Sequence, residues 1–218
     1  MTLMDLAVVL ALLAILAAVA LNLVIRQRNL QARVMQVQCA VNLKAIGDQF
    51  RFWADRHGGH FPMSLSSVID GSEEFATGTN EWRHFQALSN FGFQPKTLIC
   101  PADMRSSRWP NVRVPARDFI VFENANLSYF VGIDAKKAKG SSFLCGDRNI
   151  TNGIAIQGGL LELTTNTPAG WTEGIHDRRG AVLLADGSVN QFTDAGLRAA
   201  IAKTSLATNR LQIPITSP

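Results

Sequence analysis

The chain has 218 residues, a formal net charge of +4 and only 17% charged residues. Its Lys and Arg residues are scattered and form no basic stripe with stacking aromatic residues, which argues against a nucleic-acid partner. Its three cysteines, Cys39, Cys100 and Cys145, have no Cys-x-x-Cys or other zinc spacing. They suit one disulfide and one free thiol outside the cytoplasm.

The N-terminal segment is apolar and long enough to cross a membrane. From Leu6 to Ile25 the only polar residue is Asn22, and about 20 apolar residues suffice for a helix to span a bilayer. Leu and Ala dominate, and neither Pro nor Gly occurs before Gly47. Pro costs about 3 kcal/mol inside a helix and Gly about 1. We therefore expect one helix over residues 1–57, unbroken through residues 14–23.

Asp5 is an acid beside this apolar segment, where a charge is costly and normally has a partner. The only cation within a helical turn is the α-amino group of Met1, or that of a neighbouring molecule. The opening Met1-Thr2-Leu3-Met4-Asp5, followed by the apolar helix, resembles the mature N-terminus of type IV pilins and type II secretion pseudopilins. Met1 stands where Phe is usual in that class, and Asp5 where Glu is usual.

The resemblance implies how the chain would be processed and assembled. A prepilin peptidase removes a basic leader, Met1 is methylated, and the subunit waits in the inner membrane. The assembly machinery then adds it to a periplasmic or extracellular homopolymer, where the Met1 amine of one subunit meets Asp5 of another. Arg26, Arg28 and Arg33 follow the span, so a simple anchor would leave the C-terminal part in the cytoplasm. A removed basic leader would reverse that orientation.

The second half of the expected helix carries two apolar stripes, each with helical spacing. The first stripe is Leu30, Val34, Val37, Val41 and Ala45, and the second is Cys39, Leu43, Ile46, Phe50 and Trp53. Positions 37 and 39 lie about 200° apart around a helix, so the stripes are nearly opposite. We expect the second stripe to pack on the chain's own head and the first on other subunits.

Further segments resemble a pseudopilin subgroup from bacteria with many such proteins. They are Asn42-Leu43-Lys44 after Cys39, Cys100-Pro101, Gly146-Asp147-Arg148-Asn149, and His176 followed after nine residues by Asp186-Gly187. Cys39 shares the stripe assigned to the head, and Cys100 is expected in a loop beside the helix. We therefore predict a Cys39–Cys100 disulfide, with Cys145 free.

The fold class predicted for residues 58–218 is an α+β head with a C-terminal antiparallel sheet. The helix should stop at Gly58-Gly59, and Thr79 should cap a second helix over residues 80–89. A turn is expected at residues 146–149, and residues 154–157 and 160–164 should pair as a hairpin around Gly158-Gly159. Strands are expected at residues 119–122, 127–133, 142–144, 154–157, 160–164, 181–185 and 188–192. The last pair reads as a hairpin with a two-residue Asp186-Gly187 turn, followed by a helix over 194–203 capped by Thr193. An irregular loop is expected at 105–117, and an extended tail at the C-terminus.

His176 and the aspartates near it in the sequence allow a catalytic, a metal-binding or a structural interpretation. His176 and Asp186, with Asp177 or Asp147, could form an acid/base pair, but no Gly-x-Ser-x-Gly, His-Glu-x-x-His or Walker motif accompanies them. Asp186-Gly187 is explained by turn geometry, so we expect structural roles and no enzyme activity. Asp177, Asp186 and Asp194 could bind calcium, but they form no known calcium loop, and no cofactor is predicted.

The sequence therefore predicts a structural subunit of a helical filament. Two alternatives remain open. One is a membrane-anchored hydrolase that uses His176, and the other is a non-polymerising minor subunit or tip adaptor that binds cargo. Minor subunits of the class often lack the acid at position 5, so Asp5 favours a polymerising subunit. The sequence does not separate a secretion pseudopilus from a surface pilus.

Overall fold

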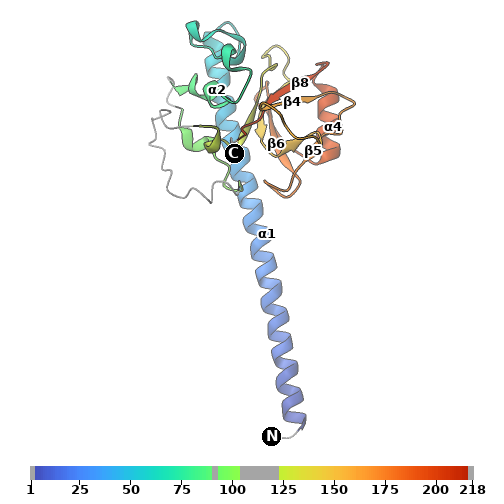
Figure 1. The fold of residues 1–218 in the computed structure, drawn as a ribbon. Helices are drawn as coiled ribbons and strands as arrows, with labels where there is room; N and C mark the ends of the chain where they lie inside the picture. Colours follow the sequence, from blue (N-terminus) through green and yellow to red (C-terminus); the bar gives the residue numbers. More distant parts are fainter. Residues whose placement is uncertain (1–2, 90–92, 104–122, 216–218) are drawn as a thin grey trace.

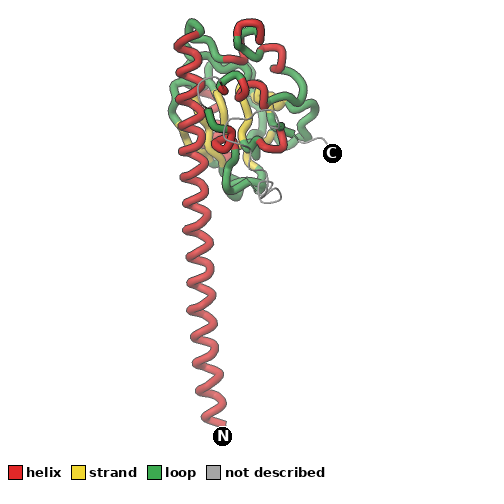
Figure 2. Tube along the Cα trace, turned by 90° about the vertical axis from the view of Figure 1, so that its left-hand side faces the viewer, coloured by secondary structure: helices red, strands yellow, loops and turns green. Residues whose placement is uncertain are grey.

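The computed structural model describes residues 3–89, 93–103 and 123–215. A single helix, α1 (Leu3–Arg56), protrudes from the head over its apolar half and lies along one side of the head over the rest (Figures 1 and 2). It ends at the predicted glycines, where Gly58 has a φ of 63° and the Gly59 amide donates to the Ala54 carbonyl at 2.8 Å. The helix ends at the predicted boundary between residues 1–57 and 58–218, although its second half shares the core of the head.

The helix is unbroken through residues 14–23, as predicted. The one polar side chain of the span, Asn22, does not interrupt it, because its Nδ2 atom donates to the Ala18 carbonyl one turn earlier at 2.8 Å. The amide group is thereby paired along the helix itself. Such pairing lets a polar side chain remain in an apolar environment.

The head is built on a six-stranded antiparallel sheet, which confirms the α+β prediction. The strand order is β4-β8-β1-β2-β6-β7. The bounds are β1 Tyr129–Gly132, β2 Phe143–Asp147, β4 Leu160–Leu163, β6 Gly180–Leu184, β7 Val189–Phe192 and β8 Asn209–Gln212. A separate pair joins β3 (Ile150–Thr151) to β5 (Gly170–Trp171).

Two α-helices and several 3₁₀ turns complete the described head. Helix α4 (Asp194–Lys203) begins as predicted, with the Thr193 hydroxyl accepting from the Gly196 amide. Helix α2 (Trp82–Gln86) is shorter than predicted, and Thr79 is not its cap, because the chain enters it through Glu81. The 3₁₀ turns are η1 Pro62–Ser64, η2 Ser67–Ile69, η3 Glu73–Phe75, η5 Pro95–Leu98 and η6 Asn124–Asn126.

Three strand predictions need correction. Residues 154–157 form no strand, since only Gln157 makes an isolated bridge, and β4 pairs instead with the C-terminal strand β8, Leu161 facing Leu211. Strand β2 runs on through the predicted turn to Asp147. The β6–β7 hairpin is present, but its loop has three residues, because the Leu184 amide bonds to the Ser188 carbonyl. Gly187, with a φ of 87°, closes that loop. Residues 105–117 and 119–122 lie outside the described residues.

The sheet lies between α1 and α4, with an apolar core on each face (Figure 1). The head-facing stripe of α1 is fully buried in the first core: Cys39, Leu43, Ile46, Phe50 and Trp53 are all 0% exposed. Gly47 allows the close approach, since a Cβ there would lie 2.6 Å from the Leu183 Cδ1 atom. The predicted packing of this stripe on the head is confirmed.

A disulfide joins Cys39 on α1 to Cys100 after η5, which is the predicted pairing, and Cys145 is free and buried. It closes a loop with a sequence separation of 61 residues. The bond holds the loop after η5 against the helix at the point where the helix enters the head.

Replacing both cysteines, as Cys39→Ser with Cys100→Ser, should lower the free energy of unfolding by about 4 kcal/mol, the chain-entropy cost of releasing a loop of this length. Denaturant unfolding followed by circular dichroism measures this change. A reducing agent should lower the stability of the wild type to a similar extent and leave the double variant unaffected. Equal stability of the two proteins without reductant would contradict the expectation.

Candidate functional site

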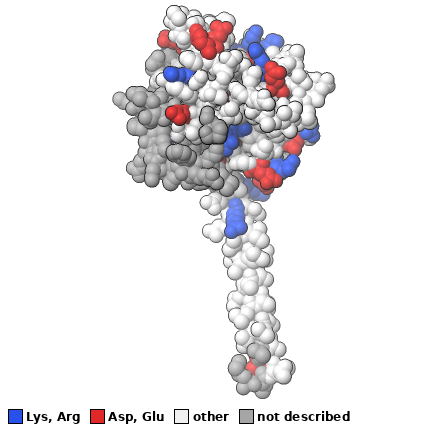
Figure 3. Space-filling model, in the orientation of Figure 1, with Lys and Arg blue, Asp and Glu red and all other residues white. Residues whose placement is uncertain are grey.

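The protruding half of α1 is long and apolar enough to cross a membrane, judged by length and composition. Its described side chains are exposed, and Figure 3 shows a nearly uncharged shaft with basic residues only close to the head. Asp5 lies near the free end of this shaft. Met1 lies outside the described residues, so its pairing with Asp5 stays a prediction.

The first apolar stripe of α1, which begins at Leu30, is exposed over Leu30 to Val41, although it continues to the level of the head. Leu30, Val34, Val37 and Val41 are 54%, 68%, 60% and 55% exposed. These residues lie opposite the buried stripe, so the head cannot cover both faces. Beyond the apolar span the helix thus presents a row of branched aliphatic side chains to solvent.

The imidazole ring of His176 contacts the disulfide at Cys100. Its Nε2 atom is 3.4 Å from the Cys100 Sγ atom and 3.8 Å from the Asp147 Oδ2 atom, and its side chain is 3% exposed. Asp147 Oδ2 accepts from the Ala181 amide at 2.7 Å, whereas its Oδ1 atom has no hydrogen-bond partner in the described structure. Burial raises the pKa of Asp147 to about 7 and lowers the pKa of His176.

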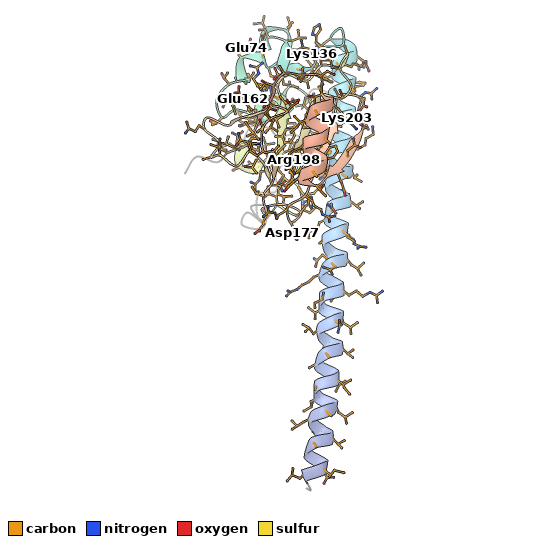
Figure 4. All side chains as sticks on the ribbon, turned by 90° about the vertical axis from the view of Figure 1, so that its right-hand side faces the viewer. Glu74, Lys136, Glu162, Asp177, Arg198 and Lys203 are labelled. Carbon is orange, nitrogen blue, oxygen red and sulfur yellow. A yellow bond between two sulfur atoms is a disulfide. The ribbon has the colours of Figure 1, made fainter. Side chains whose placement is uncertain are left out.

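The segment that carries His176 has an unusual backbone held by one side chain. His176, Asp177 and Arg178 have φ angles of 56°, 49° and 58°, which non-glycine residues rarely adopt. The Nδ2 atom of Asn149 faces the carbonyl oxygens of Ile175 at 2.8 Å and Arg179 at 3.1 Å, on either side of this segment. Figure 4 shows Asp177 at the edge of the head close to where α1 leaves it.

Asp186 does not meet His176. Its Oδ1 atom accepts from the Ser188 amide at 2.8 Å, within the hairpin loop. Its carbonyl oxygen accepts from Arg51, and the Gly187 carbonyl accepts from the Lys44 Nζ atom at 3.1 Å. The structure therefore pairs His176 with Asp147, and it uses Asp186-Gly187 as a second attachment of the sheet to α1.

The described residues offer neither a free metal-binding cluster nor a nucleophile beside His176. Among the described residues, Cys39, Cys100 and His176 bring their ligand atoms within 4.8 Å of one another, but the two sulfurs are joined and offer no thiolate. The acids weighed for calcium have separate contacts, since Asp194 accepts from the Trp171 amide and Asp186 from Ser188. A hydrolase would need a nucleophile beside His176, and the neighbouring sulfur is in a disulfide.

A second buried polar network escaped sequence reasoning because its members are far apart in the chain. The His84 Nδ1 atom accepts from the Ser72 hydroxyl, and its Nε2 atom donates to the Gln212 Oε1 atom, both at 2.7 Å. Burial lowers the pKa of His84 to about 4. The neighbouring carboxylate of Glu81 is fully buried, with no hydrogen-bond partner in the described structure, and burial raises its pKa to about 7.

Comparisons with protein-family models, with curated proteins and with solved structures find no match to this chain. Likeness to a known protein therefore assigns no class to it. The function is inferred from the exposed faces of α1 and from the contacts that fix this helix to the head.

Glu81→Gln should stabilise the head at neutral pH. The folded carboxyl group has a pKa of about 7 against an ordinary 4.5, so the native state holds an extra proton between these pH values and loses stability as the pH rises. Glutamine removes this loss, and the variant should gain up to about 3 kcal/mol over the wild type between pH 4 and pH 8. Denaturant unfolding at several pH values measures the gain. The exposed Glu173→Gln is the control, and a constant difference across this range would contradict the expectation.

Proposed function

We propose that this protein is a structural subunit of a helical filament of the type IV pilin-like class, nearest to the pseudopilins. One observation carries the proposal: α1 has two opposite apolar faces, and the head covers only one of them. A subunit whose other face packs on further copies of α1 would bury the exposed stripe. The filament then has apolar helices at its core and α+β heads outside.

The position of the exposed stripe favours a filament over a simple membrane anchor. A bilayer core is about 30 Å thick and holds about 20 helical residues. If residues up to Ile25 lie in the membrane, Val34 stands about 13 Å beyond it, and Val41 about 24 Å, at a rise of 1.5 Å per residue. Lipid cannot cover these side chains, whereas neighbouring helices can.

The remaining features fit a processed, exported subunit. Asp5 at the end of the apolar shaft offers a carboxylate to the Met1 amine of a neighbour, and one axial offset between helices would bring the two charges together. The disulfide suits an oxidising compartment. In this proposal a prepilin peptidase and an assembly machinery are partners, the methylated subunit first lies in the inner membrane, and the filament is periplasmic or extracellular.

Two alternatives make different demands. A minor subunit or tip adaptor would not need Asp5, because minor subunits of the class often lack the acid at position 5. A membrane-anchored hydrolase would depend on His176 and would not need the exposed stripe. Polymer formation by the purified chain, compared with hydrolytic activity of the same preparation, separates the three.

Val37→Glu should prevent filament formation and leave the head folded, because it places a carboxylate in the proposed interface between helices. Electron microscopy measures filament yield, and circular dichroism checks the head. Gln31→Glu adds the same charge at an exposed polar position of the same helix and should have little effect. Normal filaments from the Val37 variant would rule out this face as the interface.

Asp5→Ala should leave a folded, membrane-inserted monomer that polymerises poorly, because the register charge is lost. Asp5→Glu keeps the carboxylate and should retain assembly. Membrane fractionation measures insertion, and filament yield with helical rise measures assembly. Asp5→Ala filaments of normal yield and unchanged rise would show that Asp5 does not set the register.

A further inference from the structure

The disulfide, His176 and Asp147 form a buried cluster that takes no part in the proposed contacts between subunits. Nε2 of His176 and the two sulfur atoms all lie within 4.8 Å of one another. The ring is kept there by a segment of three left-handed residues, 176–178, which the Asn149 side chain holds. Such conformations are unfavourable for non-glycine residues, and they persist where the surroundings impose them. An unfavourable backbone conformation is therefore maintained at the segment that places the His176 imidazole against the Cys100 sulfur.

We propose that His176 is a catalytic base that promotes formation of the chain's own Cys39–Cys100 disulfide. In the reduced protein it removes the thiol proton of Cys100, the residue whose sulfur it contacts at 3.4 Å. Asp147, at 3.8 Å from the same ring nitrogen, is a positioning residue that stabilises the imidazolium. The inference is independent of the filament proposal, since it concerns only the folding of the head onto α1.

The exchange balances with an external disulfide, R–S–S–R′, as oxidant. The Cys100 proton passes to His176, and the thiolate attacks R–S–S–R′ to form Cys100–S–S–R and release R′–S⁻, which takes the proton from the imidazolium. The neutral ring then accepts the Cys39 proton, and the Cys39 thiolate attacks the Cys100 sulfur and expels R–S⁻, which takes that proton. Two thiols of this chain are oxidised, and the oxidant leaves as RSH and R′SH.

The electrostatics single out Cys100 from the other head thiol. Burial lowers the pKa of His176, so its ring is neutral at neutral pH and can accept a proton. Cys145 is also buried, and both burial and the charge of Asp147 raise the pKa of its thiol. The thiolate, not the thiol, reacts with disulfides. His176 can deprotonate Cys100, whereas burial and Asp147 keep Cys145 protonated. Both effects favour the native Cys39–Cys100 bond over a bond to Cys145.

His176 lines an open hollow of about 340 Å³ between α1 and its own segment, whereas Cys100 is fully buried in the oxidised protein. In the proposal the oxidant approaches the reduced Cys100 through this hollow. Its lining includes His176, Ala102 and Met35, and Met35 is one helical turn before Cys39. Arg33 and Arg179 also line it and favour an anionic oxidant such as glutathione disulfide. The described charged or titratable groups near the cluster are Arg33, Arg179, Asp177, Asp103 with its partner Arg148, Tyr129, Cys145 and Asp147.

The first test follows oxidation of the full chain in detergent. The protein is reduced with dithiothreitol, exchanged into buffer and treated with oxidised glutathione at pH 7, and the Cys39–Cys100 peptide is quantified after acid quenching. His176→Gln should form the bond at least tenfold more slowly, which corresponds to about one unit in the pKa of Cys100. The exposed His60→Gln is the matched control and should oxidise at the wild-type rate. A His176→Gln rate within twofold of the wild type would overturn the proposal.

The second test separates a base from a merely structural histidine. In Cys39→Ser, alkylation of Cys100 by iodoacetamide is measured from pH 5 to pH 10, with Cys145 as an internal report of a folded core. With His176 present, the midpoint should lie below the ordinary thiol value of about 8.5. Adding His176→Gln should raise it by a unit or more while Cys145 stays protected. A midpoint at or above the ordinary value in Cys39→Ser alone would overturn the proposal, whether or not the His176 variant folds.

Discussion

The burial of one face of α1 against the sheet is the interaction on which the rest of the molecule depends. Phe50 and Trp53 are among its largest fully buried side chains, and each such residue contributes on the order of 2–3 kcal/mol when removed from water. Because opposite positions on a helix are fixed relative to one another, burying this face decides which residues point outward. The exposed stripe of Val34, Val37 and Val41 is thus a consequence of the packing of the head.

The packing of β6 on α1 accounts for the spacing between His176 and Asp186-Gly187. Between them runs β6, which lies against α1 and whose five residues span about 17 Å at 3.3–3.4 Å per residue. His176 contacts the disulfide of Cys39, and Asp186 contacts Arg51, 12 residues further along the helix, or about 18 Å. The strand and the helix segment therefore match in length. His176 and Asp186 therefore contact α1 near opposite ends of its packing against β6. Neither residue needs the other as a chemical partner.

What the sequence could predict depended on whether the cause was local. The helix, its glycine stop, the β6–β7 hairpin and the Thr193 cap follow from short-range periodicity and turn chemistry. The disulfide was predictable because Cys39 shares a stripe with Leu43. The β4–β8 pair was missed because its partners are about 50 residues apart and residues 154–157 looked like the nearer partner. The left-handed run at 176–178 has no glycine to indicate it, and the buried His84 bonds to Gln212, which lies far along the chain.

The exposed stripe also bears on how a filament of this kind could leave the membrane. Lipid tails are as apolar as leucine, so moving residues 6–25 from bilayer to helical bundle gains little hydrophobic free energy. The groups that distinguish the two states lie at the ends of that span. On assembly into the proposed filament, Asp5 would exchange a polar environment for a specific cation, and the stripe from Leu30 to Val41 would pass from water into contact with other helices. In the proposed filament the driving force for assembly therefore comes from the residues outside the bilayer, and the long apolar span serves mainly as a shaft that both environments accept.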